Sequence, residues 1–455
     1  MRFVIIGGDA AGMSAASRAK RNMKELEVVV LEQTWDVSYS ACGMPYNLAD
    51  PDSDINELVV REAGVFREKQ GIDLRTGHKV EAIDRAAEVV RGKTLQGEPF
   101  EVPYDKLLIA TGASPVVPEI PGADLPGVVS LKSLQDGRLA KRLLAEPGIR
   151  QAVIVGMGYV GLEVAEALRS RGLSVDMVKP RPVLLPWLNS RLSEMVREEL
   201  EAEGVNLRFG CAVQAVERAE DGLLVVCTDK IKLPCQMVVM AMGVRPNSSL
   251  AASAGLELGI SEAVSVDRSL KTSDPDIYAA GDCADAYHVV TGEKTWIPLA
   301  LRANRAGRAV GDNVTGREVS LPGVAGTAVF KVFDLEVART GLTMEEAAEA
   351  GFDPEEEVIF SRTRAHAHPG SGTIGVHMVG DKTSGRLLGV QMVAKEGAAH
   401  RVNAPAVALS AGMSVSGFHQ CDLAYAPPFS PVWDPMLVAA EQLLKKINAP
   451  QSTKA

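Results

Sequence analysis

The chain has 455 residues, of which 46% are hydrophobic and 23% charged, and its formal net charge of −10 argues against nucleic acid or an anionic membrane as a partner. Its length predicts two or three domains, no apolar run approaches the roughly 18 residues of a membrane helix, and the N-terminus shows no signal peptide. The six cysteines lack CxxC spacing, so we expect neither a metal site nor a disulfide framework, and a reducing cytoplasm fits best.

The N-terminal segment has the pattern of a dinucleotide-binding unit. An apolar strand over Phe3–Ile6 precedes the turn "GGDAAG" at 7–12, a helix rich in small residues, and a second strand over Val28–Leu31. In such a unit the glycine turn brings a pyrophosphate to the helix N-terminus, and an acid at the tip of the second strand, here Glu32, accepts from ribose hydroxyls. The match is imperfect, because Asp9 replaces the middle glycine.

An isolated cysteine follows in the stretch "SYSACGMPY", residues 38–46, and no other cysteine occurs in the first two hundred residues. The residues after Cys42 resemble the start of a helix. Because a helix N-terminus carries partial positive charge, we expect its dipole to lower the pKa of the Cys42 thiol and to favour the reactive thiolate.

A second dinucleotide unit lies further along the chain. A strand over Ala152–Val155 leads into "GMGYVG" at 156–161, with all three glycines in place, and then into a helix and a strand over Val175–Val178. The residue at the tip of that strand is Lys179, and Arg181 follows closely. Basic residues there suit a 2′-phosphate, which favours NADPH or tolerance of both nicotinamides, although Lys179 can equally be a solvated side chain.

The segments around this second unit read as connections and as further ligand contacts. The stretches 107–118 and 237–247 each combine a buried strand with a glycine-containing turn, as expected for crossings between two domains. The acid Asp282 ends a strand beside glycine and suits a sugar or ribitol hydroxyl, or the N-cap of a helix. A helix is expected after Pro298, with its N-terminal amides facing an electron-rich ring.

After Leu321 the pattern changes to an α+β module without a nucleotide motif. Two stretches alternate in strand fashion, the turn "GDKTSG" predicts a hairpin, and residues 396–412 read as one helix. The proline-rich tail Cys421–Pro435 is expected to be rigid, extended and able to reach a partner subunit.

The paired glycine turns, the "ATG" and "GD" motifs and the C-terminal module together resemble the FAD-dependent pyridine nucleotide–disulfide oxidoreductases over nearly the whole chain. The resemblance implies an α/β fold with two Rossmann-like domains, for FAD and NAD(P)H, and a C-terminal α+β dimerisation domain. The implied limits are 1–112 with 243–320 for FAD, 113–242 for NAD(P)H, and 321–455 for dimerisation.

The resemblance also implies where the two cofactors bind. FAD is expected on Gly7, Gly8, Asp9, Ala10, Ala11, Gly12, Glu32, Gln33, Thr111, Gly112, Gly281, Asp282, Pro298, Leu299 and Ala300. NADH or NADPH is expected on Gly156, Gly158, Tyr159, Val160, Gly161, Glu163, Lys179, Arg181 and Gly243.

Within this family the chain is similar to the single-cysteine branch, which includes coenzyme A-disulfide reductases, persulfide and polysulfide reductases, NADH oxidases and NADH peroxidases. Val37 stands where two-cysteine members carry the partner of Cys42. Electrons from NAD(P)H would pass through FAD to Cys42, which would cycle through a mixed disulfide or persulfide, or alternatively through a sulfenic acid. Ala10 occupies the place of the histidine that oxidases and peroxidases carry, which favours sulfur chemistry.

Coenzyme A-disulfide reductase and NAD(P)H-dependent persulfide–polysulfide reductase are the nearest matches. Tyr425 matches a tyrosine that acts from the other subunit of a homodimer, and coenzyme A, if bound, would lie on Ser14, Arg18, Arg21, Ser38, Ala41 and Asn304. The basic side chains can also be a solvated helix face. Ala367 and His368 replace a Tyr-Tyr pair, which leaves persulfide, polysulfide or sulfur as substrates. An NADH oxidase or peroxidase, and a flavin reductase of a redox protein, are the alternatives.

Overall fold

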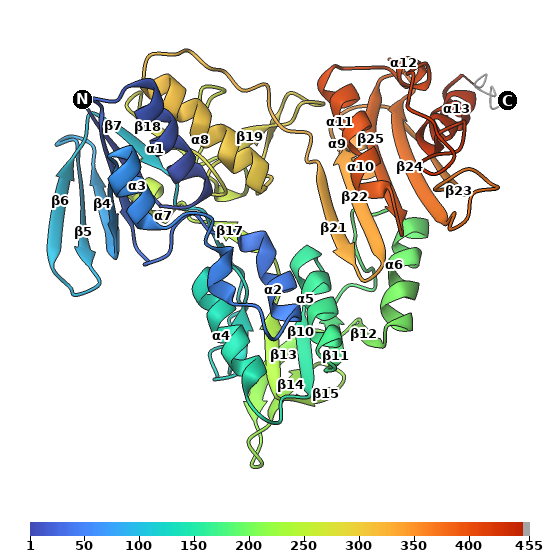
Figure 1. Ribbon diagram of the computed structural model, residues 1–455, viewed down its shortest axis with the longest axis horizontal. Helices are drawn as coiled ribbons and strands as arrows, with labels where there is room; N and C mark the ends of the chain where they lie inside the picture. Colours follow the sequence, from blue (N-terminus) through green and yellow to red (C-terminus); the bar gives the residue numbers. More distant parts are fainter. Residues whose placement is uncertain (449–455) are drawn as a thin grey trace.

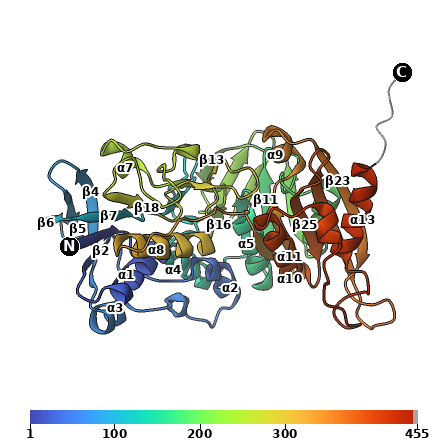
Figure 2. The same cartoon turned by 90° about the horizontal axis from the view of Figure 1, so that it is seen from above.

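Three five-stranded sheets organise the computed structural model, which describes residues 1–448 (Figure 1). Two of these sheets are parallel and the third is antiparallel. In Figures 1 and 2 the first parallel sheet and the antiparallel sheet lie at opposite ends of the molecule, and helix α2 lies between these ends. No helix among the described residues is long and apolar enough to cross a membrane.

The first parallel sheet contains the N-terminal strand at its centre, in the order β18-β7-β1-β2-β3. Apart from the edge strand β3, its strands are largely buried apolar runs, as expected for a parallel sheet that is covered on both faces. Their bounds are β1 Arg2–Ile6, β2 Glu27–Glu32, β3 Asp73–Thr76, β7 Lys106–Ile109 and β18 Ile277–Ala279. The first two strands confirm the prediction with ends moved by about one residue.

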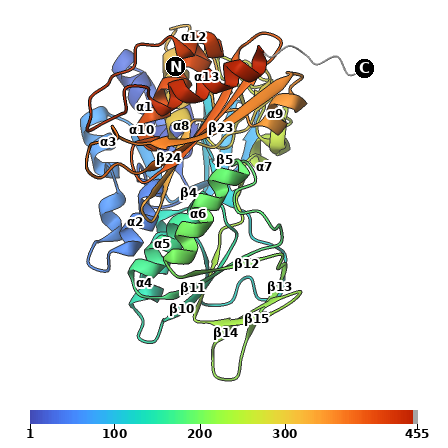
Figure 3. The same ribbon diagram turned by 90° about the vertical axis from the view of Figure 1, so that its right-hand side faces the viewer.

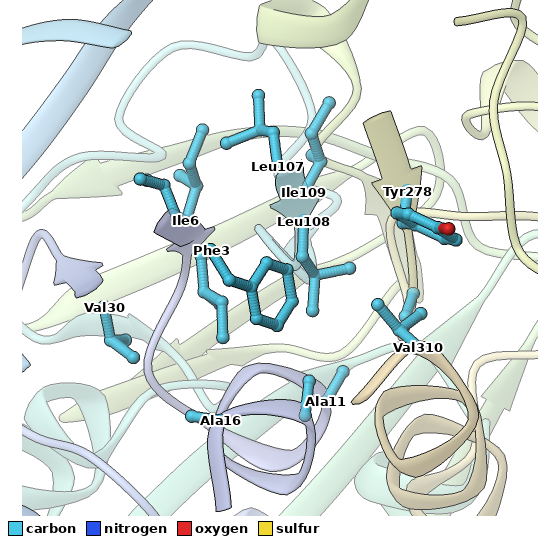
Figure 4. Packing of buried hydrophobic residues seen from close by; sticks show 14 of the residues in the cluster. Phe3, Ile6, Ala11, Ala16, Val30, Leu107, Leu108, Ile109, Tyr278 and Val310 are labelled. Atoms are coloured by element: carbon cyan, nitrogen blue, oxygen red, sulfur yellow. The ribbon is translucent and has the colours of Figure 1, made fainter. Parts of the chain in front are cut away.

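Helices α1 (Ala10–Asn22) and α8 (Ala300–Val314) cover one face of this sheet. Figure 4 shows Ala11 and Ala16 of α1 and Val310 of α8 beside Phe3 and Leu108 of the strands. The two helices approach closely, because a Cβ on Gly307 would collide with the carbonyl oxygen of Ala11. This contact joins the N-terminal part of the chain to the part that follows the second crossing, which are the two pieces of the expected discontinuous domain.

An antiparallel three-stranded sheet and short helices complete this half of the molecule. The helix expected after Cys42 is α2. The elements are η1 Ala41–Gly43, α2 Met44–Ala49, η2 Ile55–Leu58, α3 Ala63–Gln70, β4 His78–Asp84, β5 Val89–Thr94, β6 Pro99–Pro103, α7 Ser249–Ser253, η3 Ile260–Glu262, β19 Ala286–Tyr287 and β20 Lys294–Thr295.

The second parallel sheet has the order β12-β11-β10-β16-β9, and the short pair β8 and β17 runs along the two crossings. Helices α5 and α6 and the hairpin sheet β13–β15 surround it (Figure 3). The bounds are β8 Ala113–Pro115, β9 Val128–Ser130, α4 Leu134–Ala145, β10 Gln151–Val155, α5 Tyr159–Ser170, β11 Ser174–Lys179, α6 Ser190–Ala202, β12 Val205–Phe209, β13 Val213–Arg218, β14 Leu224–Thr228, β15 Lys232–Cys235, β16 Met237–Met240 and β17 Val244–Pro246.

The antiparallel sheet has the order β21-β22-β25-β24-β23 and contains the predicted hairpin as β24 and β25. The single helix expected over 396–412 is wrong, because the structure has two helices, α10 and α11, that meet at Val402. Pro405 has no N–H to donate to the carbonyl of Arg401, which interrupts the helical ladder there. The bounds are β21 Ala328–Val332, β22 Leu335–Gly341, α9 Met344–Glu349, β23 Pro354–Arg362, β24 Thr373–Asp381, β25 Leu387–Ala394, α10 Ala398–Arg401, α11 Asn403–Ser410, α12 Val415–His419 and α13 Pro435–Ile447.

Each of the three five-stranded sheets falls inside one expected segment, whereas the pair β8–β17 joins two of these segments, and the domain limits themselves stay a prediction.

Candidate active site

The first glycine turn has the shape that a dinucleotide needs. Gly7 has a φ of +109°, and a Cβ there would collide with the carbonyl oxygen of Ala110, so only glycine fits. A Cβ on Gly12 would likewise collide with the carbonyl of Gly7, which lets helix α1 start tightly against the strand. Glu32 lies at the turn, where its Oε2 accepts from the backbone N–H of Gly8 at 2.8 Å. These residues form a cradle that fits the pyrophosphate and ribose of FAD.

Asp9, at the missing glycine position, does not point a free carboxylate at this cradle. Its Oδ1 accepts from the backbone N–H of Tyr39 at 3.3 Å. Burial raises the pKa of Asp9 to about 6, and the nearby carboxylates of Glu32 and Asp282 act in the same direction. With this pKa the side chain is neutral in mild acid and mostly ionised near neutral pH, where the N–H of Tyr39 is its hydrogen-bond partner.

The remaining residues expected to hold FAD surround the turn or support it. Gly281 has a φ of +84°, and a Cβ built on it would lie 3.1 Å from the Cβ of Ala11. Leu299 is the N-cap of α8, which begins at Ala300 after Pro298. Thr111 donates its hydroxyl to the carbonyl of Asn247 at 2.6 Å. Thr111 therefore joins the two crossing segments, with Gly112 beside it at a φ of +69°.

The second glycine turn repeats the geometry. Gly156 has a φ of +111°, and a Cβ there would collide with the carbonyl of Ala241. No heavy atom lies within 4 Å of a Cβ built on Gly158, so this position opens onto free space where a pyrophosphate can approach. Gly161 lies close to Gly156 within helix α5. Tyr159 and Val160 begin this helix, and Gly243 lies at the return crossing.

The two basic residues after β11 differ in their surroundings. Lys179 donates its Nζ to the carbonyl of Leu184 at 2.9 Å, and burial lowers its pKa. Arg181 is exposed at the same strand end. Lys179 therefore already has a backbone partner, whereas Arg181 is the exposed basic side chain at this strand end.

Cys42 lies in the short turn η1 directly before α2, and its side chain is exposed. The backbone leading to it is strained, because Ser38 has a φ of +49°, a left-handed conformation that is uncommon for residues other than glycine. Hydrogen bonds hold this conformation: the N–H of Ser38 donates to Gly8 at 3.1 Å, and the N–H of Val60 donates to the Ser38 carbonyl at 2.8 Å. The thiol is thereby fixed relative to the first glycine turn.

Val37, where a two-cysteine enzyme has its second thiol, is 2% exposed and belongs to the apolar core. All six cysteines of the chain are free. Among residues 1–448, no group of three or more potential ligands that could hold a metal ion occurs.

The charges that act on the Cys42 thiol come from four separate parts of the chain. Burial raises the pKa of Cys42, Glu163 of α5 adds to this effect, Lys132 opposes it, and Asp282 and Asp9 raise it further. The net change in the pKa of Cys42 is upward, so the prediction that the helix dipole lowers this pKa is wrong. Helix α2 has only six residues, and desolvation of the thiol, followed by the charges of Glu163, Asp282 and Asp9, raises the pKa of Cys42 despite Lys132.

Lys132 is a site residue that sequence reasoning missed. Its Nζ lies 3.0 Å from Oδ2 of Asp282, and it precedes the N-cap Ser133 of helix α4. It forms part of the same charge cluster as Cys42. No motif marks this lysine, since only the folded chain brings residues 132 and 282 together.

Of the six residues expected to hold coenzyme A, four lie on α1 and α8 and the other two, Ser38 and Ala41, lie in the segment around Cys42. Ser14 donates its hydroxyl to Oδ1 of Asn304 at 2.7 Å, which links the two helices. Arg18 pairs with Asp312 at 2.7 Å, so its charge is already partly neutralised. Arg21 is exposed further along α1. Ala41 is half-buried beside Cys42.

Helix α8 adds two exposed basic residues, Arg305 and Arg308, which the sequence reading did not include. They follow Asn304 on the exposed face of the helix, while Ala306, Gly307 and Ala309 are buried. The sequence "RAGR" at 305–308 could have indicated them, because residues three apart share one face of a helix. With Arg18 and Arg21 they make a basic strip along the two helices.

Tyr425 is 48% exposed and lies in the tail between α12 and α13. Figures 1 and 3 show these helices well away from α2, which follows Cys42. Arg401 fixes the tail, since its guanidinium donates to Asp434 at 2.9 Å and to the carbonyl of Phe429 at 2.7 Å. Residues 421–434 of the tail form neither helix nor strand and turn at 427–429, so the tail is not extended throughout.

The loop that carries Ala367 and His368 is tied to this tail. The backbone N–H of Ala365 donates to the carbonyl of Pro427 at 3.1 Å. His368 is half-buried, and Ala367 is exposed. The loop and the tail thus form one surface of the C-terminal sheet domain.

Two dinucleotide cradles on parallel sheets, with a single exposed thiol between charged residues of both, define a two-nucleotide redox enzyme. The chain belongs to the pyridine nucleotide-disulphide oxidoreductase family: residues 1–307 match the "Pyridine nucleotide-disulphide oxidoreductase" model, and residues 327–436 match its dimerisation domain. As a member of this family, it is an FAD-dependent oxidoreductase that uses NADH or NADPH.

Several similar proteins have described activities. The chain is 39% identical over 446 residues to an "NAD(P)H sulfur oxidoreductase (CoA-dependent)" of Pyrococcus furiosus, with 97% of this chain and 99% of that protein covered. It is 34% identical over 453 residues to an "NADH oxidase" of Methanocaldococcus jannaschii, with 98% and 100% covered. The solved structure of an NAD-dependent persulfide reductase from A. fulgidus superposes with a TM-score of 0.94 at 35% identity, covering 98% of this chain and 83% of that one.

Proposed function

We propose that this enzyme uses NAD(P)H to reduce the S–S bond of coenzyme A disulfide, coenzyme A persulfide or polysulfide through Cys42. The observation that carries the proposal is the exposed, isolated thiol of Cys42, held by a strained backbone within the charge cluster of both cradles. With no second cysteine nearby, Cys42 must take its second sulfur from a substrate. The sulfur activities named for the relatives of Pyrococcus furiosus and A. fulgidus support this.

The proposed chemistry on the protein side is a thiolate exchange. The Cys42 thiolate attacks one sulfur of RS–SR, a Cys42–S–SR bond forms, and RS⁻ leaves and takes up a proton. FAD would supply the electron pair, taken from NAD(P)H, that reduces the mixed disulfide to the Cys42 thiolate and a second RS⁻. For each turnover, NAD(P)H and one proton reduce one disulfide to two thiols.

FAD would rest on the cradle of Gly7, Gly12 and Glu32, and NAD(P)H on the cradle of Gly156 and Gly158 with Arg181 at its end. The protein contributes tight turns that admit a pyrophosphate and an acid that accepts from ribose.

The basic strip is the proposed dock for the phosphates of coenzyme A. Arg21, Arg305 and Arg308 are exposed along it, and Ser14 and Asn304 lie at one of its ends. A cluster of arginines on a protein of net charge −10 is a local exception that suits an anionic substrate.

The enzyme is further proposed to be a cytoplasmic homodimer in which Tyr425 of the partner subunit completes each site. The match to a dimerisation domain, the exposure of Tyr425 and its separation from α2 within one chain support this. A phenol there could donate a proton to the leaving thiolate.

The decisive experiment compares wild type and Cys42→Ser with coenzyme A disulfide, coenzyme A persulfide and polysulfide as acceptors. The variant should retain FAD and lose at least about 100-fold in turnover with every sulfur substrate. Full turnover in the variant would reject the proposal. Cys211→Ser, at a buried cysteine, is the matched control and should be unchanged.

An NADH oxidase is the second candidate, because the relative of Methanocaldococcus jannaschii bears that name. Ala10 is the first residue of helix α1 and supplies no imidazole to stabilise a sulfenate. Oxygen turnover that exceeds sulfur turnover under matched conditions would reverse the ranking.

A further inference from the structure

Helix α2, which follows Cys42, is joined to helix α5, which carries part of the second glycine turn, by a hydrogen bond between two side chains. The hydroxyl of Tyr46 donates to Oε1 of Glu163 at 2.8 Å. Arg171, at the end of α5, adds a second link, since its guanidinium donates to the carbonyl of Leu48 at 3.3 Å. The two links hold the Cys42 helix against the helix that carries the second glycine turn.

Glu163 is a partly desolvated carboxylate. Burial raises its pKa, the hydrogen bond from Tyr46 lowers it, and Glu166 one turn further along α5 raises it slightly. Tyr46 therefore stabilises the ionised form of Glu163. Of these three influences on the pKa of Glu163, the hydrogen bond from Tyr46 is the one that favours the charged carboxylate.

The charge of Glu163 acts on the thiol of Cys42. Among the charged groups that face this thiol, Glu163 is the strongest, Lys132 opposes it, and Asp282 and Asp9 are weaker. Cys42 lies in η1, which runs directly into α2, so the hydrogen bond from Tyr46 places Glu163 against the same short segment that carries the thiol.

We propose that Tyr46 is a positioning residue, whose hydroxyl holds the Glu163 carboxylate where it controls how readily Cys42 becomes a thiolate. The hydrogen bond keeps Glu163 ionised and oriented, and the ionised carboxylate disfavours a second negative charge on the sulfur. Because Glu163 also belongs to the expected NAD(P)H site, the pair connects the nucleotide side of the enzyme to the thiol side. The importance of this control rests on the proposed function of Cys42.

The test measures the ionisation of Cys42 directly, as the rate of its alkylation by iodoacetamide between pH 6 and 9 in the FAD-loaded enzyme. Peptide mass spectrometry assigns the adduct to Cys42, which distinguishes it from the other five thiols. Only the thiolate reacts, so the rate at pH 7 follows the thiolate fraction.

Glu163→Gln removes the carboxylate charge and should increase the rate at pH 7 by about 3- to 10-fold. Tyr46→Phe removes the donor that holds the Glu163 carboxylate in place, so the carboxylate can turn away from the thiol and the rate should increase by about 2- to 4-fold. In the Glu163→Gln background, Tyr46→Phe should have no further effect, because its action passes through Glu163.

Tyr104→Phe is the matched control, since this buried phenol has Asp274, Glu88 and Arg85 as its charged neighbours and should leave the rate unchanged. If Tyr46→Phe fails to fold, Glu163→Asp replaces it, because the shorter side chain withdraws the carboxylate from the phenol. Its rate should lie between those of wild type and Glu163→Gln.

An alkylation rate in Glu163→Gln that is unchanged or slower than in wild type overturns the inference. An equal effect of Tyr46→Phe in the wild-type and Glu163→Gln backgrounds also overturns it, because Tyr46 would then have a general structural role. These outcomes are separate from the test of the proposed function. Sulfur turnover that survives Cys42→Ser rejects the function, while the alkylation rates still report on the Tyr46–Glu163 pair.

Discussion

Replacing Asp9 by asparagine tests the electrostatics of the first cradle. Burial raises the pKa of Asp9 from 3.8 to about 6, so the folded protein holds a proton that the unfolded chain releases at lower pH. A pKa raised by folding contributes stability below about pH 4 that is lost as the pH rises through about 6. The shift corresponds to at most about 3 kcal/mol, and partial exposure of the side chain reduces this to about 1–3 kcal/mol.

Asp9→Asn is nearly isosteric, and its amide oxygen can still accept from the N–H of Tyr39. We expect equal free energies of unfolding for wild type and variant near pH 4, and a variant more stable by about 1–3 kcal/mol at pH 8. Equilibrium urea unfolding at a fixed FAD concentration, followed by circular dichroism between pH 4 and 8, measures the difference.

Asp312→Asn supplies a control of opposite sign. Burial alone would raise the pKa of Asp312, but hydrogen bonds from Arg18 and Asn22 outweigh it and lower the pKa. This variant should be less stable than wild type at pH 8 and approach it as the pH falls. Parallel stability profiles for Asp9→Asn and wild type would refute the assignment of an unfavourable buried charge to Asp9.

Three further substitutions probe the nucleotide turn, nucleotide choice and the tail. Gly158→Ala should fold with normal FAD content, and titration calorimetry should show NAD(P)H binding weakened at least about 10-fold. Gly156→Ala should yield little folded protein, because its Cβ would collide with the Ala241 carbonyl. Arg181→Glu should raise the KM for NADPH about 10-fold or more and that for NADH much less, and equal changes would remove this residue from phosphate recognition. Arg401→Met should free the proline-rich tail, seen as faster proteolysis there, and an unchanged cleavage rate would contradict its anchoring role.

Much of the fold follows from short-range patterns in the sequence. The buried strands β1, β2, β10 and β11 are continuous apolar runs, and each pair encloses a glycine turn whose geometry only glycine permits. Such local constraints are visible in one dimension. The broken helix at Val402 was missed because the effect of Pro405 on the preceding turn competes with a helical composition on both sides.

The electrostatics of the site depended on contacts that a sequence does not reveal. The helix after Cys42 was predicted, and its dipole was a sound local reason to expect a lower thiol pKa. The opposing charges come from residues 9, 163 and 282, which are distant in sequence and near Cys42 only after folding. The same reason hid Lys132 and the pairing of Arg18 with Asp312.

Glu163 illustrates how one residue can serve two parts of the reaction. Its place two residues after the second glycine motif is the reason to expect it at NAD(P)H, and its hydrogen bond to Tyr46 links it to the helix that follows the thiol. Helix α5 also meets the antiparallel sheet, because Glu166 accepts from the N–H of Phe333 at 2.8 Å and Tyr159 packs on Phe330 at 4.9 Å. A substitution on this helix therefore perturbs nucleotide binding, thiol ionisation and the contact with the dimerisation domain together. Kinetic effects at Glu163 should be separated by measuring alkylation and nucleotide affinity on the same protein.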